Sequence, residues 1–386
     1  MIDKYVALIF LVCMHILISC NEGNETADQA ADVIELDIRK ALIQKEQDHF
    51  VSDLTEKINY IPLETNESCL LTMVHDMFLF RDHIFISDFK GLYQFDVSGR
   101  FVRQIGRSGK GPGEHGQMIR FTVDTIQNEI LLLSSGKMNV YDLETGFYKR
   151  RFDVNFDVSK FTIIPKGYIV FFTNELPKST LASTINEIFI TDNNGHIVDS
   201  VPNYNRLNYS SVVVGYVNLY SINDELRFIY NFRDTLFIFD ELFTKRAHIA
   251  LTLDNKVDPN KLIIEAMDGV QLLDFIWIFN FLENNNYTFI TTQNGIGGAE
   301  RYLNNLLYDK KANILIKTAD FKNDIDGGMS FWPKFSAGNT LITHFQPYEL
   351  IDHYRSTIGT IDHGESFLHL INNLEEGDNP VLVFVQ

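Results

Sequence analysis

The sequence contains few of the residues that tie small secreted domains together or hold structural metal ions. Three cysteines occur in 386 residues, and the spacing of Cys13, Cys20 and Cys69 fits no zinc-binding pattern. Cys13 lies within an apolar stretch near the N-terminus and Cys20 ends that region, which argues against a disulfide framework. No HExxH sequence is present, and we expect neither a bound metal ion nor another cofactor.

Positively charged residues are too few to balance the acidic ones. The chain has 33 Lys and Arg against 51 Asp and Glu, which gives a formal net charge of −18. Binding to nucleic acids and to anionic lipid surfaces both depend on clusters of cationic side chains. We therefore expect no nucleic-acid partner, and we interpret the negative charge as a source of solubility.

A long apolar run is also missing. The apolar stretch from Tyr5 to Ile18 is shorter than the roughly 20 residues that a membrane-spanning helix needs. Its length fits the apolar region of a secretory signal peptide. The stretch is followed by Ser19 and Cys20, and the sequence Leu-Ile-Ser-Cys resembles the bacterial lipobox. This resemblance implies cleavage before Cys20 and lipidation of its sulfur, whereas the alternative is an uncleaved anchor helix.

These features predict three segments. Residues 1–19 form a lipoprotein signal peptide, residues 20–32 form a flexible acidic tether, and residues 33–386 form a single domain. An acidic stretch soon after the lipidated cysteine resembles the export signal of some Bacteroidota lipoproteins. We therefore predict a lipid-anchored protein of the cell envelope, on the outer membrane, with the periplasmic and surface-facing sides both left open.

Short strand-like runs fill the predicted domain and recur at a regular step. They are rich in aromatic and β-branched residues and alternate with turn sequences that contain glycine, serine or asparagine. Five runs end in an aspartate, and successive aspartates are 46, 50, 48 and 69 residues apart: Asp96, Asp142, Asp192, Asp240 and Asp309. We expect Asp96, Asp142 and Asp240 to accept hydrogen bonds from turn amides.

A repeat of about 40–50 residues with several strands in each unit is typical of a β-propeller. With a last unit around residues 330–344, the count predicts an all-β, six-bladed propeller with four-stranded blades. Short helical insertions are expected near residues 259–267 and 366–374. The alternative architecture is a β-sandwich with a second domain. We expect the ring to close by pairing the final strand, residues 381–385, with an early strand at residues 33–38.

The stretch from Ile105 to His115 contains four glycines and one proline, and it resembles a phosphate-binding loop at first sight. A P-loop requires a Gly-Lys-Ser/Thr sequence that opens a helix, whereas here Lys110 is followed by Gly-Pro-Gly. We therefore interpret the stretch as the crossover between two blades. The alternative is a ligand contact made by Arg107, Lys110 and His115.

Four stretches carry a family resemblance. They are "YIPLET" (residues 60–65), "FDVSGRFVRQIGRSGKGPGEH" (residues 95–115), "FWP" (residues 331–333) and "GDNPVLVFV" (residues 377–385). Together they resemble the six-bladed, NHL-like β-propeller lipoproteins of Bacteroidota, over roughly residues 33–386. A tyrosine is usual in that family where this chain has His115. That family has no agreed catalytic residues, so the resemblance transfers none to this chain.

Residue chemistry favours binding over catalysis. Acidic residues are scattered at strand ends, and Cys69 is expected to be a buried small hydrophobe. We therefore expect no catalytic residues and predict a non-enzymatic propeller that binds a ligand or a protein partner. The alternatives are a surface glycan-active enzyme, a lyase or glycoside hydrolase, and a structural subunit. An enzyme would bring two carboxylates, or a histidine and a carboxylate, together near the axis. The predicted helix at 366–374 packs on one face of the propeller or docks a partner.

Overall fold

The computed structural model describes residues 33–88, 90–116, 119–173, 186–202, 217–222, 225–255, 275–295 and 302–386. The predicted signal peptide, the predicted tether and the predicted helix at residues 259–267 lie outside these ranges. None of the helices in the described ranges combines the length and the apolar character that a membrane crossing requires.

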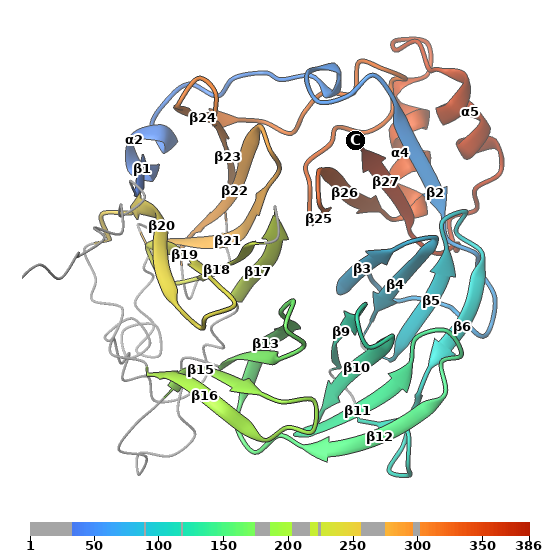
Figure 1. The fold of residues 1–386 in the computed structure, drawn as a ribbon. Coiled ribbons are helices and arrows are strands. Elements are labelled where there is room, and N and C mark those ends of the chain that lie inside the picture. The colour runs from blue at the N-terminus through green and yellow to red at the C-terminus, as the bar shows by residue number, and fades with distance from the viewer. Residues whose placement is uncertain are drawn as a thin grey trace, which may run out of the picture. The chain divides into compact units, whose positions relative to one another are not determined.

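Six antiparallel sheets are arranged in a ring, which confirms the predicted six-bladed propeller (Figure 1). Each of the first five blades contains four antiparallel strands that are consecutive in the sequence. Blade one consists of β3 (Asp76–Phe80), β4 (His83–Ser87), β5 (Leu92–Asp96) and β6 (Phe101–Ile105). Blade two consists of β9 (Arg120–Asp124), β10 (Glu129–Ser134), β11 (Lys137–Asp142) and β12 (Tyr148–Asp153). Blade three consists of β13 (Val158–Ile163), β14 (Ile169–Thr173), β15 (Asn186–Thr191) and β16 (Ile197–Pro202). Blade four consists of β17 (Val217–Ile222), β18 (Glu225–Tyr230), β19 (Thr235–Phe239) and β20 (Lys245–Thr252). Blade five consists of β21 (Ile276–Glu283), β22 (Tyr287–Asn294), β23 (Tyr302–Asp309) and β24 (Ile314–Thr318).

The repeated aspartates mark equivalent places in the first five blades. Each lies at or directly after the end of the third strand, as the sequence step predicts. Asp96, Asp142 and Asp240 accept main-chain hydrogen bonds within the following turn, each at 2.9 Å from the nearest amide nitrogen. This confirms the structural role expected for these three side chains, because the carboxylate replaces the missing partners of turn amides.

The apolar core is divided into layers between neighbouring blades. Phe85 of blade one packs with Phe121 and Ile130 of blade two, and Phe172 of blade three packs with Phe228 of blade four. These side chains are almost fully buried. Each sheet is thus covered on both faces by its neighbours, which is how a propeller buries strands that are apolar on both sides.

The sixth blade closes the ring with strands from both ends of the domain. Its order is β2 (Ile58–Pro62), β27 (Val381–Val385), β26 (Thr340–Phe345) and β25 (Phe335–Ala337). The predicted closure by the final strand is therefore confirmed, but the predicted partner at residues 33–38 is wrong. That segment forms β1 (Ile34–Asp37), which lies beside β20 as a fifth strand of blade four. Alternation of apolar residues identifies a strand but does not specify its neighbour.

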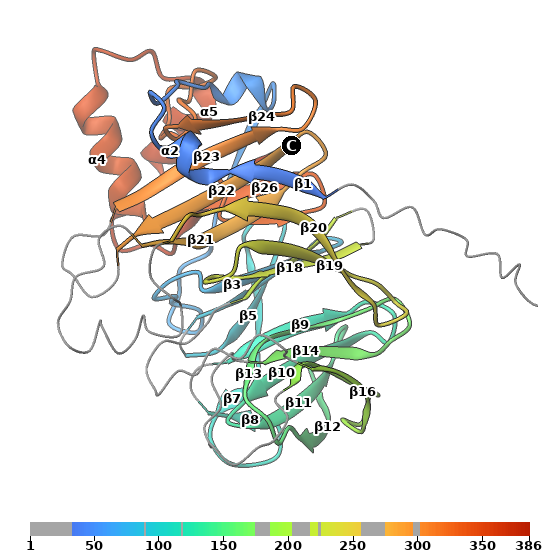
Figure 2. The same ribbon diagram turned by 90° about the vertical axis from the view of Figure 1, so that its left-hand side faces the viewer.

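A helical hairpin is inserted between β26 and β27. It consists of α4 (Pro347–Thr357) and α5 (Glu365–Asn372), and α5 confirms the helix predicted near residues 366–374. Leu350, Phe367 and Leu370 pack with Val381 and attach the hairpin to the closing blade. The side view shows α4 projecting beyond the neighbouring strands (Figure 2). Four shorter elements complete the described chain: α2 (Ile38–Leu42), the 3-10 helix η1 (Val51–Asp53), and the strands β7 (Arg107–Ser108) and β8 (Glu114–His115), which pair with each other.

Candidate functional site

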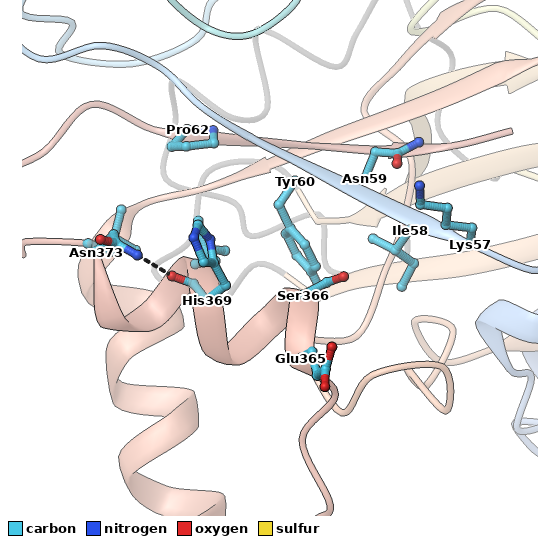
Figure 3. Close-up of a pocket in the computed structure, with 11 residues that line it drawn as sticks. Lys57, Ile58, Asn59, Tyr60, Pro62, Glu365, Ser366, His369 and Asn373 are labelled. Atoms are coloured by element: carbon cyan, nitrogen blue, oxygen red, sulfur yellow. Dashed lines mark hydrogen bonds between the residues drawn. The ribbon is translucent and has the colours of Figure 1, made fainter.

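A groove of about 530 Å³ lies between the outer strand of the closing blade and the second helix of the hairpin (Figure 3). Its lining comes from β2 and the residue before it, and from α5 and the residues after it: Lys57, Ile58, Asn59, Tyr60, Pro62, Glu365, Ser366, His369, Leu370, Asn373 and Leu374. The two walls are about 300 residues apart in the sequence, and ring closure together with the hairpin insertion brings them together.

The groove follows the edge of β2. Successive side chains of a strand point to opposite faces of its sheet. Tyr60 belongs to the core layer shared with blade five, and Ile61 belongs to the layer shared with blade one. Since Ile58, Asn59 and Tyr60 all line the groove, it is lined by residues from both faces of the strand.

The opposite wall is one side of α5. Ser366, His369 and Asn373 are three and four residues apart, so they lie along the same face of the helix. They are exposed, whereas Phe367 and Leu370 are buried against the closing blade. Leu370 lies at the boundary between these faces and gives the groove an apolar floor.

Buried hydrogen bonds hold the two walls in place. Tyr60 Oη lies 3.0 Å from Asp326 Oδ1, and Asn323 Nδ2 donates to the same carboxylate oxygen at 2.7 Å. Burial, followed by the nearby Asp326 charge, raises the pKa of the Tyr60 hydroxyl, so that it stays a neutral donor. Gly364 N donates to Asp326 O at 3.0 Å, which links the same loop to the start of α5.

Several polar groups in the groove are free to bind a ligand. Within the described chain, the side chains of Lys57, Asn59, Glu365, Ser366 and His369 make no hydrogen bond or ion pair that would occupy them. Polar side chains beside an apolar floor are typical of sites that fix the orientation of a ligand. The groove is therefore our candidate functional site.

A second polar cluster lies between blades five and six. Asn305 Nδ2 donates to Asp320 Oδ1 at 2.6 Å, and Lys334 Nζ donates to His344 O at 3.2 Å. Surrounding protein raises the pKa of the Asp320 carboxyl and lowers the pKa of the Lys334 ammonium. Burial, and then the charge of Lys334, lowers the pKa of His344 to about 4. Asp320 and Lys334 are nevertheless exposed, so solvent reaches part of this cluster.

The innermost strands β3, β9, β13, β17, β21 and β25 surround the axis of the ring (Figure 1). Their accessible side chains include Phe279, Asn218 and Asn280, which are aromatic or small and polar. Asp76 forms an ion pair with Lys160 at 3.4 Å. The closely paired histidines and carboxylates in the described ranges include His49 with Asp53 and His196 with Asp192, both outside the innermost strands. The innermost strands therefore carry charged side chains as well as aromatic and small polar ones.

The glycine-rich stretch joins blade one to blade two, which matches its interpretation as a crossover. The loop encloses a carboxylate of its own, because Gly111 N donates to Glu114 Oε2 at 2.7 Å. A Cβ on Gly109 would lie 2.1 Å from the same oxygen, so a larger residue there would displace the Glu114 carboxylate. Arg151 fixes the loop on blade two through Gly111 O at 2.8 Å.

The three residues predicted as ligand contacts in this loop have different surroundings. Arg107 and Lys110 are exposed, whereas His115 is 2% exposed and its Nδ1 lies 2.8 Å from Gly116 O. Contacts of Arg107, Lys110 and His115 with a ligand remain a prediction. Lipidation of Cys20, which lies outside the described ranges, remains one as well.

Other candidate side chains have structural partners. His353 and His363 lie together in the hairpin with ring centroids 6.2 Å apart, and His353 Nε2 lies 3.0 Å from Gly327 O. No three His, Cys, Asp or Glu side chains of the described residues are placed to hold a metal ion. Cys69 is free and fully buried, in agreement with the expected apolar role.

The sequence pattern identified only one wall of the groove. The apolar spacing at residues 366–374 predicted α5 and allowed it a docking role, whereas β2 was quoted only as part of a family motif. Only the folded structure shows that the side chains of Lys57 and Glu365 have no polar partner among the described residues. No sequence signal could have paired two segments so distant in the chain.

Comparison with known proteins agrees with the fold. A protein of Bacteroides fragilis described as exported has 19% sequence identity and a TM-score of 0.71, over 92% of this chain and 99% of its own. The extracellular domain of a one-component system from B. thetaiotaomicron has 13% identity and a TM-score of 0.39, over 74% of this chain and 30% of its own. No curated protein matches the sequence. The model of the domain of unknown function DUF4934 matches residues 33–386, and the chain therefore belongs to the DUF4934 family.

Proposed function

We propose that this protein is an exported, lipid-anchored binding protein that takes its ligand in the groove between β2 and α5. The observation that carries the proposal is the set of polar side chains without partners around an apolar floor. Lys57 and Glu365 supply charges of opposite sign, and Ser366 and His369 supply hydrogen-bonding groups along the same helix. A propeller holds such groups on a rigid frame, which limits the entropy lost on binding.

Different observations support export and lipid anchoring. The sequence before Cys20 resembles a lipobox, and the fold is shared with a B. fragilis protein described as exported. Several acyl chains on one residue give lasting membrane attachment. The expected location is the cell envelope, on the outer membrane. Replacing Cys20 by Ala should move the protein from the membrane fraction to the soluble fraction and abolish incorporation of labelled palmitate; continued membrane attachment would contradict lipid anchoring.

The binding role can be tested with the lipid-free chain from residue 21 onward. A glycan array and a library of linear peptides provide the probes. Ser366→Trp fills the groove, and Asn372→Trp places the same side chain on an exposed position of α5 that does not line it. We expect Ser366→Trp to weaken binding by about tenfold or more and Asn372→Trp to leave it unchanged.

Two results would contradict this function. Binding that persists in Ser366→Trp would move the ligand site away from the groove. Release of cleaved products from a bound glycan would instead support the alternative of a glycan-active lyase or glycoside hydrolase. Glu365 and His369, one helical turn apart in the groove, would then be the first residues to replace.

A further inference from the structure

We propose that the groove accepts an extended peptide segment of a partner protein, which adds to the outer edge of β2 as a fifth strand of the closing blade. This inference rests on the proposed function, because it names the ligand class for the same groove.

The first argument is the main chain of β2. Leu63 N donates to Pro380 O at 3.3 Å, so Leu63 and Pro380 are a hydrogen-bonded pair of the two strands. In the same register, two residues along, Ile61 lies opposite Leu382. Hydrogen-bonded and non-bonded pairs alternate in an antiparallel ladder. Ile58 and Tyr60 are therefore in non-bonded pairs, and their N–H and C=O groups point away from β27. Among the described residues, no group forms a hydrogen bond with these four main-chain atoms. Such an edge is a template for another strand.

The open part of this edge has defined ends. At one end β2 begins at Ile58, and Thr55 holds the preceding Lys57 in a local turn, because Lys57 N donates to Thr55 Oγ1 at 3.2 Å and Thr55 Oγ1 donates to Lys57 O at 3.1 Å. At the other end Pro62 has no N–H, and its carbonyl lies so close to Gly99 that a Cβ there would be 2.1 Å away. The open edge therefore fits a short segment and not a long strand.

The side chains around the edge predict the pattern of the peptide. Ile58 of β2 and Leu370 of α5 line the groove with apolar side chains, whereas Asn59 provides a polar side chain on the other face of β2. Successive side chains of an added strand alternate between these two environments. We expect bound peptides to alternate apolar and polar residues.

The fold itself provides a precedent for strand addition. Blade four has the strand order β1-β20-β19-β18-β17, so its outer strand β20 already pairs with a segment from outside the four-stranded repeat. The outer strand β2 holds the equivalent position in the closing blade and has no such neighbour among the described strands. Strand addition to an exposed sheet edge is a recurring mode of peptide recognition.

The first experiment selects linear peptides from a random library on the lipid-free chain from residue 21. Peptides that also bind Ser366→Trp are discarded, and Asn372→Trp serves as the matched control. We expect the remaining sequences to share the apolar–polar alternation. Failure to obtain any peptide whose binding depends on the groove would overturn the proposal.

The second experiment tests the main-chain hydrogen bonds directly. N-methylation of a selected peptide should weaken binding by about tenfold or more at alternate positions, whose amides point toward β2, and have little effect at the positions between them. On binding, amide hydrogen exchange at Ile58 and Tyr60 should slow by about tenfold or more, while Asn59 and Ile61, already paired with β27, change little.

The outcomes separate the two proposals. If groove-dependent peptides tolerate N-methylation at every position and leave the exchange of Ile58 and Tyr60 unchanged, strand addition is wrong and the binding function stands. If glycans and not peptides bind in a manner that Ser366→Trp abolishes, the groove is a ligand site of another class. If neither class of probe depends on the groove, both proposals fail.

Discussion

Closure of the ring by β27 should control the stability of the whole propeller, and Leu382→Ala tests this. Leu382 is fully buried and packs in the layer between blades six and one, with Ile84, Ile86 and Phe95. The truncation removes buried apolar atoms and leaves a cavity between the two ends of the ring. For a fully buried leucine, this costs about 2.7–5 kcal/mol of unfolding free energy.

Removing residues 381–386 should have a much larger effect. The five side chains of β27 are each at most 5% exposed, and burial of one such side chain contributes about 1.5–3 kcal/mol. Their combined loss is about 8–15 kcal/mol, comparable to the entire stability of a typical domain. Because β2 and β26 both pair with β27, we expect the truncated chain not to form a closed ring.

Urea denaturation followed by tryptophan fluorescence measures both effects. Two matched controls separate closure from simple loss of burial. Leu242→Ala, at a position 74% exposed, should change the unfolding free energy by less than about 0.5 kcal/mol. Leu132→Ala creates a similar cavity between blades one and two, but it should not raise amide exchange in β2 as Leu382→Ala does. The reasoning is refuted if Leu382→Ala costs under 1 kcal/mol or if the truncated chain keeps its denaturation midpoint.

Three further predictions follow from polar groups. Burial alone raises the pKa of the Glu283 carboxyl, but Lys310 and Arg227 lower it below its usual range; Glu283→Gln leaves Lys310 without its carboxylate and Arg227 with Glu225 alone, and it should cost about 3–5 kcal/mol in urea denaturation, whereas an unchanged midpoint would contradict the pairing. The folded-state pKa of His344, about 4, lies below its unfolded value. The unfolded chain therefore binds more protons between about pH 4 and 6.5, and stability should fall by up to about 3 kcal/mol as the pH drops through this range. This pH dependence should be weaker in His344→Gln, and equal slopes for the two proteins would refute the assignment. Glu114→Ala removes the acceptor of Gly111 N; it should destabilise the chain by about 1 kcal/mol and speed amide exchange of Gly111, and unchanged exchange would show that the carboxylate does not hold the loop.

Much of the fold could be predicted because its repeating signals are local. A strand that ends in Asp96 or Asp142, followed by a turn and another strand, carries its pattern within a few residues. The glycine-rich crossover was interpretable for the same reason, since Lys110 is followed by a sequence that cannot open a helix. α4 was missed because its residues are mostly polar and only Pro347, Leu350 and Ile351 are buried.

The candidate site was much harder to predict, because it depends on contacts between distant segments. The helical pattern around Phe367 indicated α5, but nothing in the pattern named β2 as its neighbour. The polar cluster of Asp320, Lys334 and His344 was not predicted either, since isolated charged residues are ordinarily solvated. Burial and proximity, which change the pKa of these groups, are properties of the folded chain.

The amino-acid sequence by itself determined the repeating blades, their number, the acidic turns and the predicted lipidation at Cys20. These depend on residue periodicity and on short motifs, which act over a few residues. Only the tertiary structure decided that Ile58–Pro62, and not residues 33–38, closes the ring, and that this strand faces α5 across a groove. The physical reason is that an apolar strand can pair with many others, and the choice among them depends on which arrangement buries the most surface in the assembled ring.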